Sequence, residues 1–153
     1  YLALNDVLVG RGQRVRIVRS DVRIDGVAFA EYYGDGVLVA TATGSTAYSL
    51  AAGGPVLDPE MNNLMLTPVL PHLMVVRSVV LPPEATVEVT VRTDHEAVVS
   101  VDGQIDLPVR DGATIQASVA PERCRFLRAR PPTHFYQHLN RRLCTVPVQP
   151  RLE

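Results

Sequence analysis

Residues 86–92 read Thr-Val-Glu-Val-Thr-Val-Arg, an alternation of valine with polar side chains. Successive side chains of a β-strand point to opposite faces, so this stretch predicts a strand with one buried face and one solvated face. Similar runs recur along the chain, and valine, with 24 copies against 4 of isoleucine, dominates its aliphatic residues. Because β-branched residues favour strands, the chain is predicted to be mainly β.

The same pattern places further short strands on both sides of this stretch. We predict them at 2–9, 14–19, 22–24, 27–29, 37–41, 64–70, 75–81, 97–101, 104–109, 114–119 and 123–129. Asp-Gly dipeptides at 25–26, 35–36, 102–103 and 111–112 predict turns between them. Many short strands without intervening helices favour a β-sandwich-like domain or a folded antiparallel sheet.

Two segments have helical signals. A short helical turn is predicted at 46–52, ended by the glycines and proline at 53–55. A C-terminal helix is predicted after Thr133 as N-cap, with apolar residues at 135, 136, 139 and 143 on one face. The expected organisation is therefore a β domain at 1–130, a helical segment at 131–144 and a poorly ordered tail at 145–153.

Composition excludes several classes of function. All 15 basic residues are arginine, against 16 acidic residues, so the net charge is −1. The lack of lysine excludes a Walker A loop and lysine-based catalysis. The near-neutral balance argues against nucleic acid as the main partner. No apolar run reaches the roughly 18 residues that a membrane span requires.

The chain ends and the cysteines suggest the context of the protein. The first residues carry neither an initiator methionine nor a signal peptide, so we expect this chain to be part of a longer protein. Cys124 and Cys144 are too few for a disulfide framework and show no metal-binding spacing. This cysteine usage predicts a reducing compartment, the cytoplasm.

Residues 41–55 read T-A-T-G-S-T-A-Y-S-L-A-A-G-G-P, a run rich in hydroxyls and glycine. Backbone N–H groups at the start of the helical turn, together with Thr43, Ser45 and Thr46, can bind a nucleotide, and Tyr48 offers a flat aromatic face. The alternative is an N-capped helix in which Ser and Thr have only their usual capping role.

Asn5 and Asp6 interrupt the apolar run L-A-L-N-D-V-L-V. On a strand these neighbours point to opposite faces, so at least one of them should be partly buried and need hydrogen-bond partners. An Asn-Asp pair presents donors and acceptors suited to ribose hydroxyls or to the edge of a base. The alternative is a strand end or bulge where the pair caps a turn.

Other candidates for chemistry are weaker. His134 and His138 have the i, i+4 spacing of a zinc helix, but Phe135 replaces the glutamate of that motif and no third ligand is evident, so no metal site is predicted. Ser45 lacks the following glycine of a hydrolase nucleophile elbow.

Six short motifs resemble, in their order and approximate spacing, the C-terminal domain of the NAD kinase family. They are Leu4-Asn5-Asp6, Gly34-Asp35-Gly36, the T-G-S-T-A-Y run at 43–48, Ala52-Gly53-Gly54-Pro55, Pro71-His72 and Asp102-Gly103-Gln104. The resemblance covers residues 2 to about 143. It implies a β-sandwich-like domain that binds NAD, joined to an N-terminal α/β domain whose G-G-D-G motif, absent from this sequence, supplies the catalytic aspartate.

The family phosphorylates the 2′-hydroxyl of the adenosine ribose of NAD to give NADP, with ATP or polyphosphate as donor and a divalent cation such as Mg²⁺ on the phosphates. The resemblance therefore implies a kinase that assembles as a homodimer or homotetramer, with no catalytic or metal-ligating residue in this chain. The residues it places on the dinucleotide are Asn5, Asp6, Arg16, Tyr33, Asp35, Thr43, Thr46, Ala47, Tyr48, Ser49, Leu50, Ala51 and Gln104.

This sequence departs from the usual family pattern at five positions. Ala42 and Ser78 replace prolines, Ala51 replaces a serine, Tyr33 stands where a basic residue is frequent, and Asp6 replaces the commoner glutamate. Two other interpretations stay open on sequence alone. One is a related lipid kinase of the diacylglycerol and sphingosine type. The other is a non-catalytic module for nucleotide binding or oligomerisation.

Overall fold

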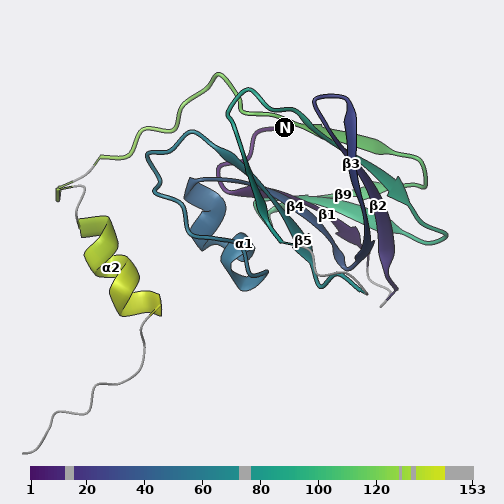
Figure 1. Cartoon of the computed structure of the whole chain (residues 1–153), viewed down its shortest axis with the longest axis horizontal. Coiled ribbons are helices and arrows are strands. Elements are labelled where there is room, and N and C mark those ends of the chain that lie inside the picture. Colours follow the sequence, from purple (N-terminus) through teal and green to yellow (C-terminus); the bar gives the residue numbers. More distant parts are fainter. Residues whose placement is uncertain (13–15, 73–76, 128, 132–133, 144–153) are drawn as a thin grey trace, which may run out of the picture. The chain divides into compact units, whose positions relative to one another are not determined.

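The computed structural model describes residues 1–12, 16–72, 77–127, 129–131 and 134–143 (Figure 1). The predicted N-cap Thr133, the tail at 145–153 and the starts of the strands predicted at 14–19 and 75–81 lie outside these residues. The chain divides into two compact units, Tyr1–Glu122 and Arg123–Glu153. Among the described residues, no helix has both the length and the hydropathy of a membrane span.

The first unit is built of two antiparallel sheets (Figure 1). Sheet A has six strands in the order β6-β5-β4-β1-β8-β9, and sheet B has four in the order β10-β7-β2-β3. Sheet A contains β1 (Asp6–Arg11), β4 (Gly36–Thr41), β5 (Leu64–Val69), β6 (Val79–Leu81), β8 (Ala97–Val101) and β9 (Ile105–Val109). Sheet B contains β2 (Val18–Ile24), β3 (Val27–Gly34), β7 (Val87–Arg92) and β10 (Thr114–Ala117). The predicted β-sandwich is confirmed.

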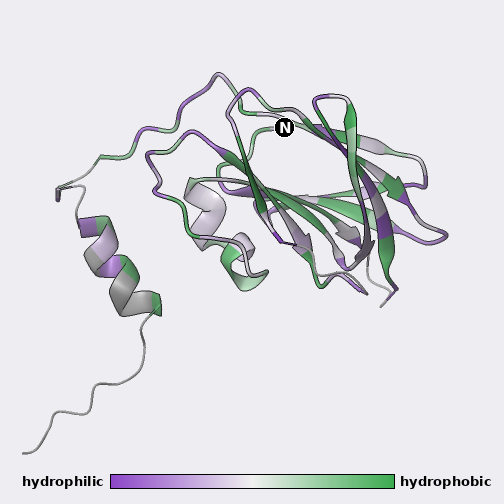
Figure 2. Ribbon diagram, in the orientation of Figure 1, coloured by the Kyte–Doolittle hydropathy of each residue, from purple (hydrophilic) through white to green (hydrophobic). Residues whose placement is uncertain are grey.

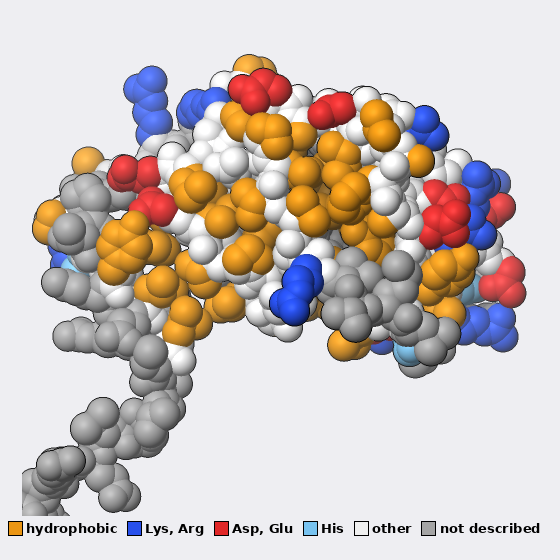
Figure 3. All heavy atoms as spheres, in the orientation of Figure 1, with side chains coloured by type: hydrophobic (Ala, Val, Ile, Leu, Met, Phe, Trp, Pro, Cys, Tyr) orange, Lys and Arg blue, Asp and Glu red, His pale blue; other side chains and the backbone are white. Residues whose placement is uncertain are grey.

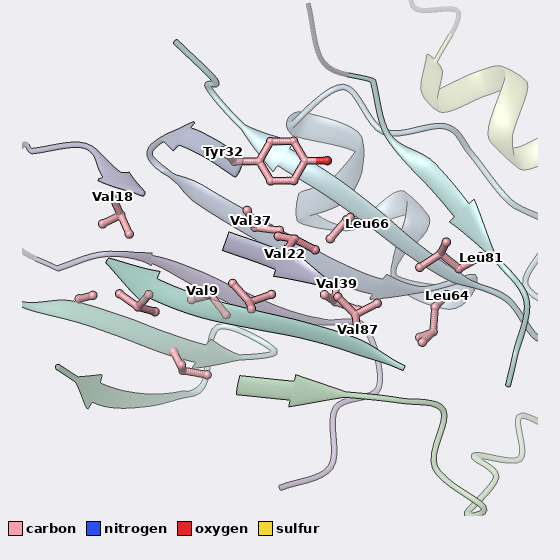
Figure 4. Packing of buried hydrophobic residues seen from close by; sticks show 14 of the residues in the cluster. Val9, Val18, Val22, Tyr32, Val37, Val39, Leu64, Leu66, Leu81 and Val87 are labelled. Atoms are coloured by element: carbon pink, nitrogen blue, oxygen red, sulfur yellow. The ribbon is translucent and has the colours of Figure 1, made fainter. Parts of the chain in front are cut away.

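The core lies between the two sheets. Val22 from β2, Val89 from β7 and Val37 from β4 are each at most 2% exposed, and Figure 4 shows Val22 and Val37 among the buried side chains of both sheets. Along β7 the valines are buried while Glu88 and Thr90 between them are half-buried, as the alternation predicts. Figure 2 shows the hydrophobic residues concentrated in the strands. Burial of the valine faces therefore holds the sandwich together.

Two neighbouring strands of sheet A are buried on both faces. β5 is buried along its whole length, and β4 is buried except at Thr41. One face of this pair packs in the core, and Leu38, Ala40 and Met65 on the other face form a second cluster with Ala42 and Leu57. The segment that follows β4 therefore covers the outer face of sheet A. It contains a 3₁₀ turn, η1 (Thr43–Thr46), and the short helix α1 (Tyr48–Ala51), close to the predicted helical turn.

Five strand predictions need correction. The strand predicted at 2–9 begins only at Asp6, because the Asp102 carboxylate accepts the N–H groups of residues 4–6 and the chain bends there. The predictions at 22–24 and 14–19 merge, where described, into β2, which starts at Val18. The described residues of 75–81 are a strand only at Val79–Leu81. Residues 123–127 are exposed and form no strand, because a strand needs a sheet partner and none pairs with them.

The Asp-Gly dipeptides are of two kinds. Those at 25–26 and 102–103 join neighbouring strands of one sheet, and both residues of each have positive φ, which Gly adopts freely and Asp tolerates. Those at 35–36 and 111–112 carry the chain from one sheet to the other, from β3 to β4 and from β9 to β10. The dipeptide predicts the turn but not which sheet the next strand joins.

In the second unit, helix α2 (His134–Leu143) confirms the predicted C-terminal helix.

The displayed surface carries both apolar and charged side chains (Figure 3). Figure 3 shows apolar side chains spread over the displayed face, with arginine and acidic side chains interspersed around them.

The core makes a prediction for stability. Val89→Ala, at a side chain 1% exposed, removes two buried methyl groups and should lower the free energy of unfolding by about 2 kcal/mol, measured by chemical denaturation. The matched control is Val27→Ala, at a side chain 69% exposed, which should change it by less than about 0.5 kcal/mol. Equal losses in the two variants would contradict the position of the core.

Candidate functional site

Three segments meet at one end of sheet A because of the way β1 is paired. The start of β1 lies beside the end of β4, with Asp6 opposite Ala40, and beside the end of β8, with Val7 opposite Val101. The loop after β4, at 43–51, and the turn after β8, at 102–104, therefore flank Asn5 and Asp6. Most residues that the resemblance places on the dinucleotide come together here, and we call this end of the sheet the Asn5–Asp6 end.

The backbone of Asn5 lies directly against Gly44. A Cβ atom added at Gly44 would lie 2.0 Å from the carbonyl oxygen of Asn5, so no other residue fits without a shift of the backbone. The N–H of Thr41 donates to the same carbonyl at 2.9 Å. The Thr41 hydroxyl donates to the Leu4 carbonyl at 2.7 Å and accepts the N–H of Gly44 at 3.0 Å. These contacts fix the hydroxyl-rich loop to the start of β1.

Asp6 is the buried member of the Asn-Asp pair. It is 7% exposed, whereas Asn5 is half-buried and precedes the strand. Burial raises the pKa of the Asp6 carboxyl, and the nearby Asp102 carboxylate raises it further. The position at the strand end is the one that the capping interpretation expects, and Asn5 as a whole is only partly buried there.

Asp102 was missing from the predicted binding residues, although it belongs to one of the resembling motifs. Its carboxylate accepts the N–H groups of Leu4, Asn5 and Asp6. Burial alone would raise the pKa of Asp102, but these hydrogen bonds outweigh it and hold the pKa below its usual value. The contacts cross 96 to 98 residues of sequence, so only the spacing of the two motifs, and no local pattern, could have indicated them.

The loop at 43–51 has an inner and an outer side. Ser45 and Ser49 are fully buried, while Thr46, Ala47, Tyr48 and Ala51 are exposed and Thr43 and Leu50 are half-buried. The Ser45 hydroxyl accepts the N–H of Leu57 at 3.0 Å and donates to its carbonyl at 3.3 Å. Ser45 thus attaches the loop to the segment that precedes β5, and the exposed residues form the surface that a ligand can reach.

Ser49 belongs to a chain of hydroxyl groups beneath α1. Its hydroxyl lies 3.3 Å from that of Thr67 in β5, and the Thr67 hydroxyl donates to Ser78 at 3.0 Å. Gly54 leaves the room for this, because a Cβ there would lie 2.3 Å from the Ser49 hydroxyl. Ser78, one of the departures from the family pattern, therefore has a partner in the packing of the loop.

The remaining predicted residues lie elsewhere. Asp35 is at the opposite end of β1, where its backbone carbonyl accepts the N–H of Arg11 and its carboxylate pairs with the Arg11 guanidinium at 3.1 Å. Gly10 there pairs with Gly36, so about 13 Å of strand separates this region from Asp6. Tyr33, whose hydroxyl contacts Glu31, and Arg16, which lies 3.7 Å from Asp94, are also outside the Asn5–Asp6 end. We call Arg16, Tyr33 and Asp35 the Asp35 group.

Gln104 completes the list of predicted residues. It is exposed in the turn after β8, and its N–H donates to the carbonyl of Val101 at 3.0 Å.

Among the described residues, no group of three His, Cys, Asp or Glu side chains is arranged to hold a metal ion. The His134 and His138 rings stack at 5.8 Å on α2. A shallow hollow on sheet B, between Asp21 and Phe29, contains none of the predicted residues.

The fold and the site together define a class of protein, a two-sheet β domain that carries a glycine-hydroxyl loop beside an Asn-Asp pair. Residues 4–129 match the family model of the ATP-NAD kinase C-terminal domain. The chain belongs to this family and corresponds to its C-terminal domain. The match favours the family suggested by the six motifs over the lipid-kinase alternative.

Similar proteins agree with this assignment. The NAD kinase of Dehalococcoides mccartyi (strain CBDB1) is 44% identical over 143 residues, 94% of this chain and 50% of that protein. The NAD kinase of Koribacter versatilis is 46% identical over 131 residues, 85% of this chain and 46% of that protein. The chain thus spans about half the length of the NAD kinases it matches.

Two solved structures have the same fold. One is the crystal structure of an NAD kinase from Archaeoglobus fulgidus in complex with ATP, with a TM-score of 0.72 and 32% identity over 78% of this chain and 46% of that one. The other is yeast NADH kinase complexed with NADH, with a TM-score of 0.73 and 27% identity over 99% of this chain and 44% of that one.

The contact between Gly44 and Asn5 can be tested by mutation. Gly44→Ala should lower the midpoint of chemical denaturation markedly, because the new methyl group meets backbone atoms that cannot move independently. The control is Gly53→Ala. Nothing lies within 4 Å of a Cβ there, so only its positive φ of 85° is penalised, by about 1 kcal/mol. A Gly44→Ala protein as stable as the control would show that the loop does not rest on Asn5.

Proposed function

We propose that this domain binds NAD in a kinase that phosphorylates the 2′-hydroxyl of the adenosine ribose to give NADP. The observation that carries the proposal is the placement of Asn5 and Asp6 next to the loop at 43–51, which has an exposed side. The Asn5 amide can donate and accept hydrogen bonds with a base edge, and a carboxylate accepts from ribose hydroxyls. Tyr48, 47% exposed, offers an aromatic face for stacking.

The outer side of the loop supplies the rest of the proposed contacts. Thr46, Ala47, Tyr48 and Ala51 present backbone and side-chain groups to solvent, with Thr43, Leu50 and Gln104 at the margins. Ala51 has no hydroxyl, so its contribution is a backbone and methyl contact. Ser49, whose hydroxyl is buried against Thr67, acts by holding the loop in place.

The phosphoryl transfer itself needs a second domain. In the proposed reaction the ribose 2′-hydroxyl attacks the γ-phosphorus of ATP, its proton passes to a catalytic base, and ADP leaves. The base and most contacts to ATP, or to polyphosphate as an alternative donor, would come from an N-terminal α/β domain of the same protein. A divalent cation such as Mg²⁺ would sit on the donor phosphates, since the described residues offer no protein cage for it.

We propose that the protein acts as a homodimer or homotetramer in the cytoplasm. Asp35 lies about 13 Å of strand away from Asp6, so it reaches the same part of a ligand only from another copy of the chain. In such an assembly Arg16 would face phosphate, for which its planar guanidinium is suited, and Asp35 a polar edge of the dinucleotide, with Tyr33 beside it. The exposed free Cys124 fits a reducing compartment.

The proposed activity predicts that the full-length protein forms NADP from NAD and ATP in the presence of Mg²⁺. The product is measured with an NADP-specific dehydrogenase, and polyphosphate replaces ATP in a parallel reaction. Omission of the cation should abolish the signal. Binding of NAD without any NADP, with active controls, would instead support the non-catalytic module.

The proposed NAD site predicts that Asn5→Ala weakens NAD binding about tenfold, measured by calorimetry on the full-length protein, because the amide loses its hydrogen bonds to the ligand. The backbone contacts of Asn5 with Thr41 and Gly44 do not depend on its side chain, so folding should be preserved. His134→Ala, on α2, is the control and should bind NAD as the wild type does. Equal affinities in both variants and the wild type would refute the assignment of Asn5.

A further inference from the structure

The carboxylate of Asp102 gathers three consecutive backbone N–H groups. Its Oδ2 accepts from Leu4 at 2.7 Å, and its Oδ1 accepts from Asn5 at 2.7 Å and from Asp6 at 3.0 Å. Hydrogen bonds to an ionised acceptor are roughly twice as strong as neutral ones. Three of them on neighbouring residues fix the backbone on both sides of the Asn5 side chain.

The backbone of Asp102 completes the connection. Its own N–H donates to the carbonyl of Asp6 at 2.9 Å, so the two residues are joined by hydrogen bonds in both directions. Asp102 has a φ of 51°, in the left-handed region that Asp tolerates better than most residues, and Gly103 follows with a φ of 64°. The turn after β8 is therefore shaped to aim this carboxylate at the start of β1.

Asn5 is consequently held from two directions. Asp102 binds its N–H, and Thr41 binds its carbonyl, which also lies against Gly44. Every backbone polar group of Asn5 has a partner, and its side chain is the part left for a ligand. Both oxygens of the Asp102 carboxylate, by contrast, already accept protein N–H groups, so its role is within the protein.

We propose that Asp102 is a positioning residue that sets the affinity for the dinucleotide by holding Asn5 and Asp6 in place, without itself contacting the ligand. The inference rests on the proposed function of the Asn5–Asp6 end. Loss of the carboxylate would leave three N–H groups unpaired and free the segment before β1, so NAD binding would require that segment to be ordered again.

The same arrangement has an electrostatic consequence. After burial, the negative charge of Asp102 is the second cause of the raised pKa of Asp6. Neutralising Asp102 removes that repulsion, so the pKa of Asp6 should fall when Asn replaces Asp102. A purely structural role distant from Asp6 would leave this pKa unchanged.

The test compares Asp102→Ala and Asp102→Asn in the full-length protein. Asp102→Ala should raise KM for NAD about tenfold or more, with KM for ATP unchanged. Asp102→Asn keeps one acceptor oxygen and should give a smaller rise. Hydrogen exchange without ligand should be faster at the amides of residues 4–6 in both variants, and the Asn variant, by NMR titration, should show a lower pKa for Asp6.

Asp25 provides a matched control. It too precedes a glycine and has a φ of 50°, and its Oδ1 accepts the N–H of Thr86 at 2.8 Å, but it lies in the turn between β2 and β3 of sheet B. Asp25→Ala therefore also places alanine at a positive φ and removes a carboxylate that accepts a backbone N–H. It should leave the KM for NAD and the KM for ATP unchanged.

Several results would overturn the inference. One is an unchanged KM for NAD in Asp102→Ala. Another is an equal rise of KM for NAD and ATP in the Asp102 and Asp25 variants, which would indicate general destabilisation. If the wild type does not bind NAD, the proposed function fails. If the amides of residues 4–6 exchange as slowly in both Asp102 variants as in the wild type, the positioning role of Asp102 is refuted independently of NAD.

Discussion

The pairing of β1 between β4 and β8 is the constraint on which the rest of the domain depends. It makes β1 a central strand of sheet A and brings the residues before β1, the loop after β4 and the turn after β8 to one end. None of these segments is regular enough to hold its own shape. The segment before β1 is fixed by the other two, through Gly44 on one side of Asn5 and Asp102 on the other.

The architecture could be predicted because strands that pack in a sandwich alternate apolar and polar residues along the sequence. Alternating valines identified β7, and the apolar runs identified β4 and β5, whose two faces are both covered. The limits of strands were less predictable where a partner decides them. The alternation at 123–127 matches a strand, yet no sheet edge pairs with it, and β1 starts late because a side chain 96 residues away takes its first N–H groups.

The site could be predicted in its motifs but not in the orientation of their side chains. Ser45 and Ser49 are chemically as suitable for a ligand as Thr46, but the turn of η1 and α1 directs both serines inward, Ser45 to Leu57 and Ser49 to Thr67 of β5. Asp35 follows the same motif order as the other residues, and it still lies at the opposite end of β1, because the chain passes there from sheet B to sheet A. Sequence order alone does not show which ends of different strands lie together in the sheet.

The hydroxyl chain beneath α1 shows how departures from a family pattern depend on one another. A proline at 78 would offer Thr67 no side-chain acceptor, whereas Ser78 accepts its proton and leaves the Thr67 oxygen able to accept from Ser49. The loop thus gains a fixed inner side while Ala51 gives up a hydroxyl on the outer side. The fixed position of the loop is important for the proposed ligand because the chain has no lysine that could bind it. At the Asn5–Asp6 end recognition must come from backbone groups, hydroxyls and an Asn-Asp pair, and such short groups bind well only if the segments carrying them are held rigidly.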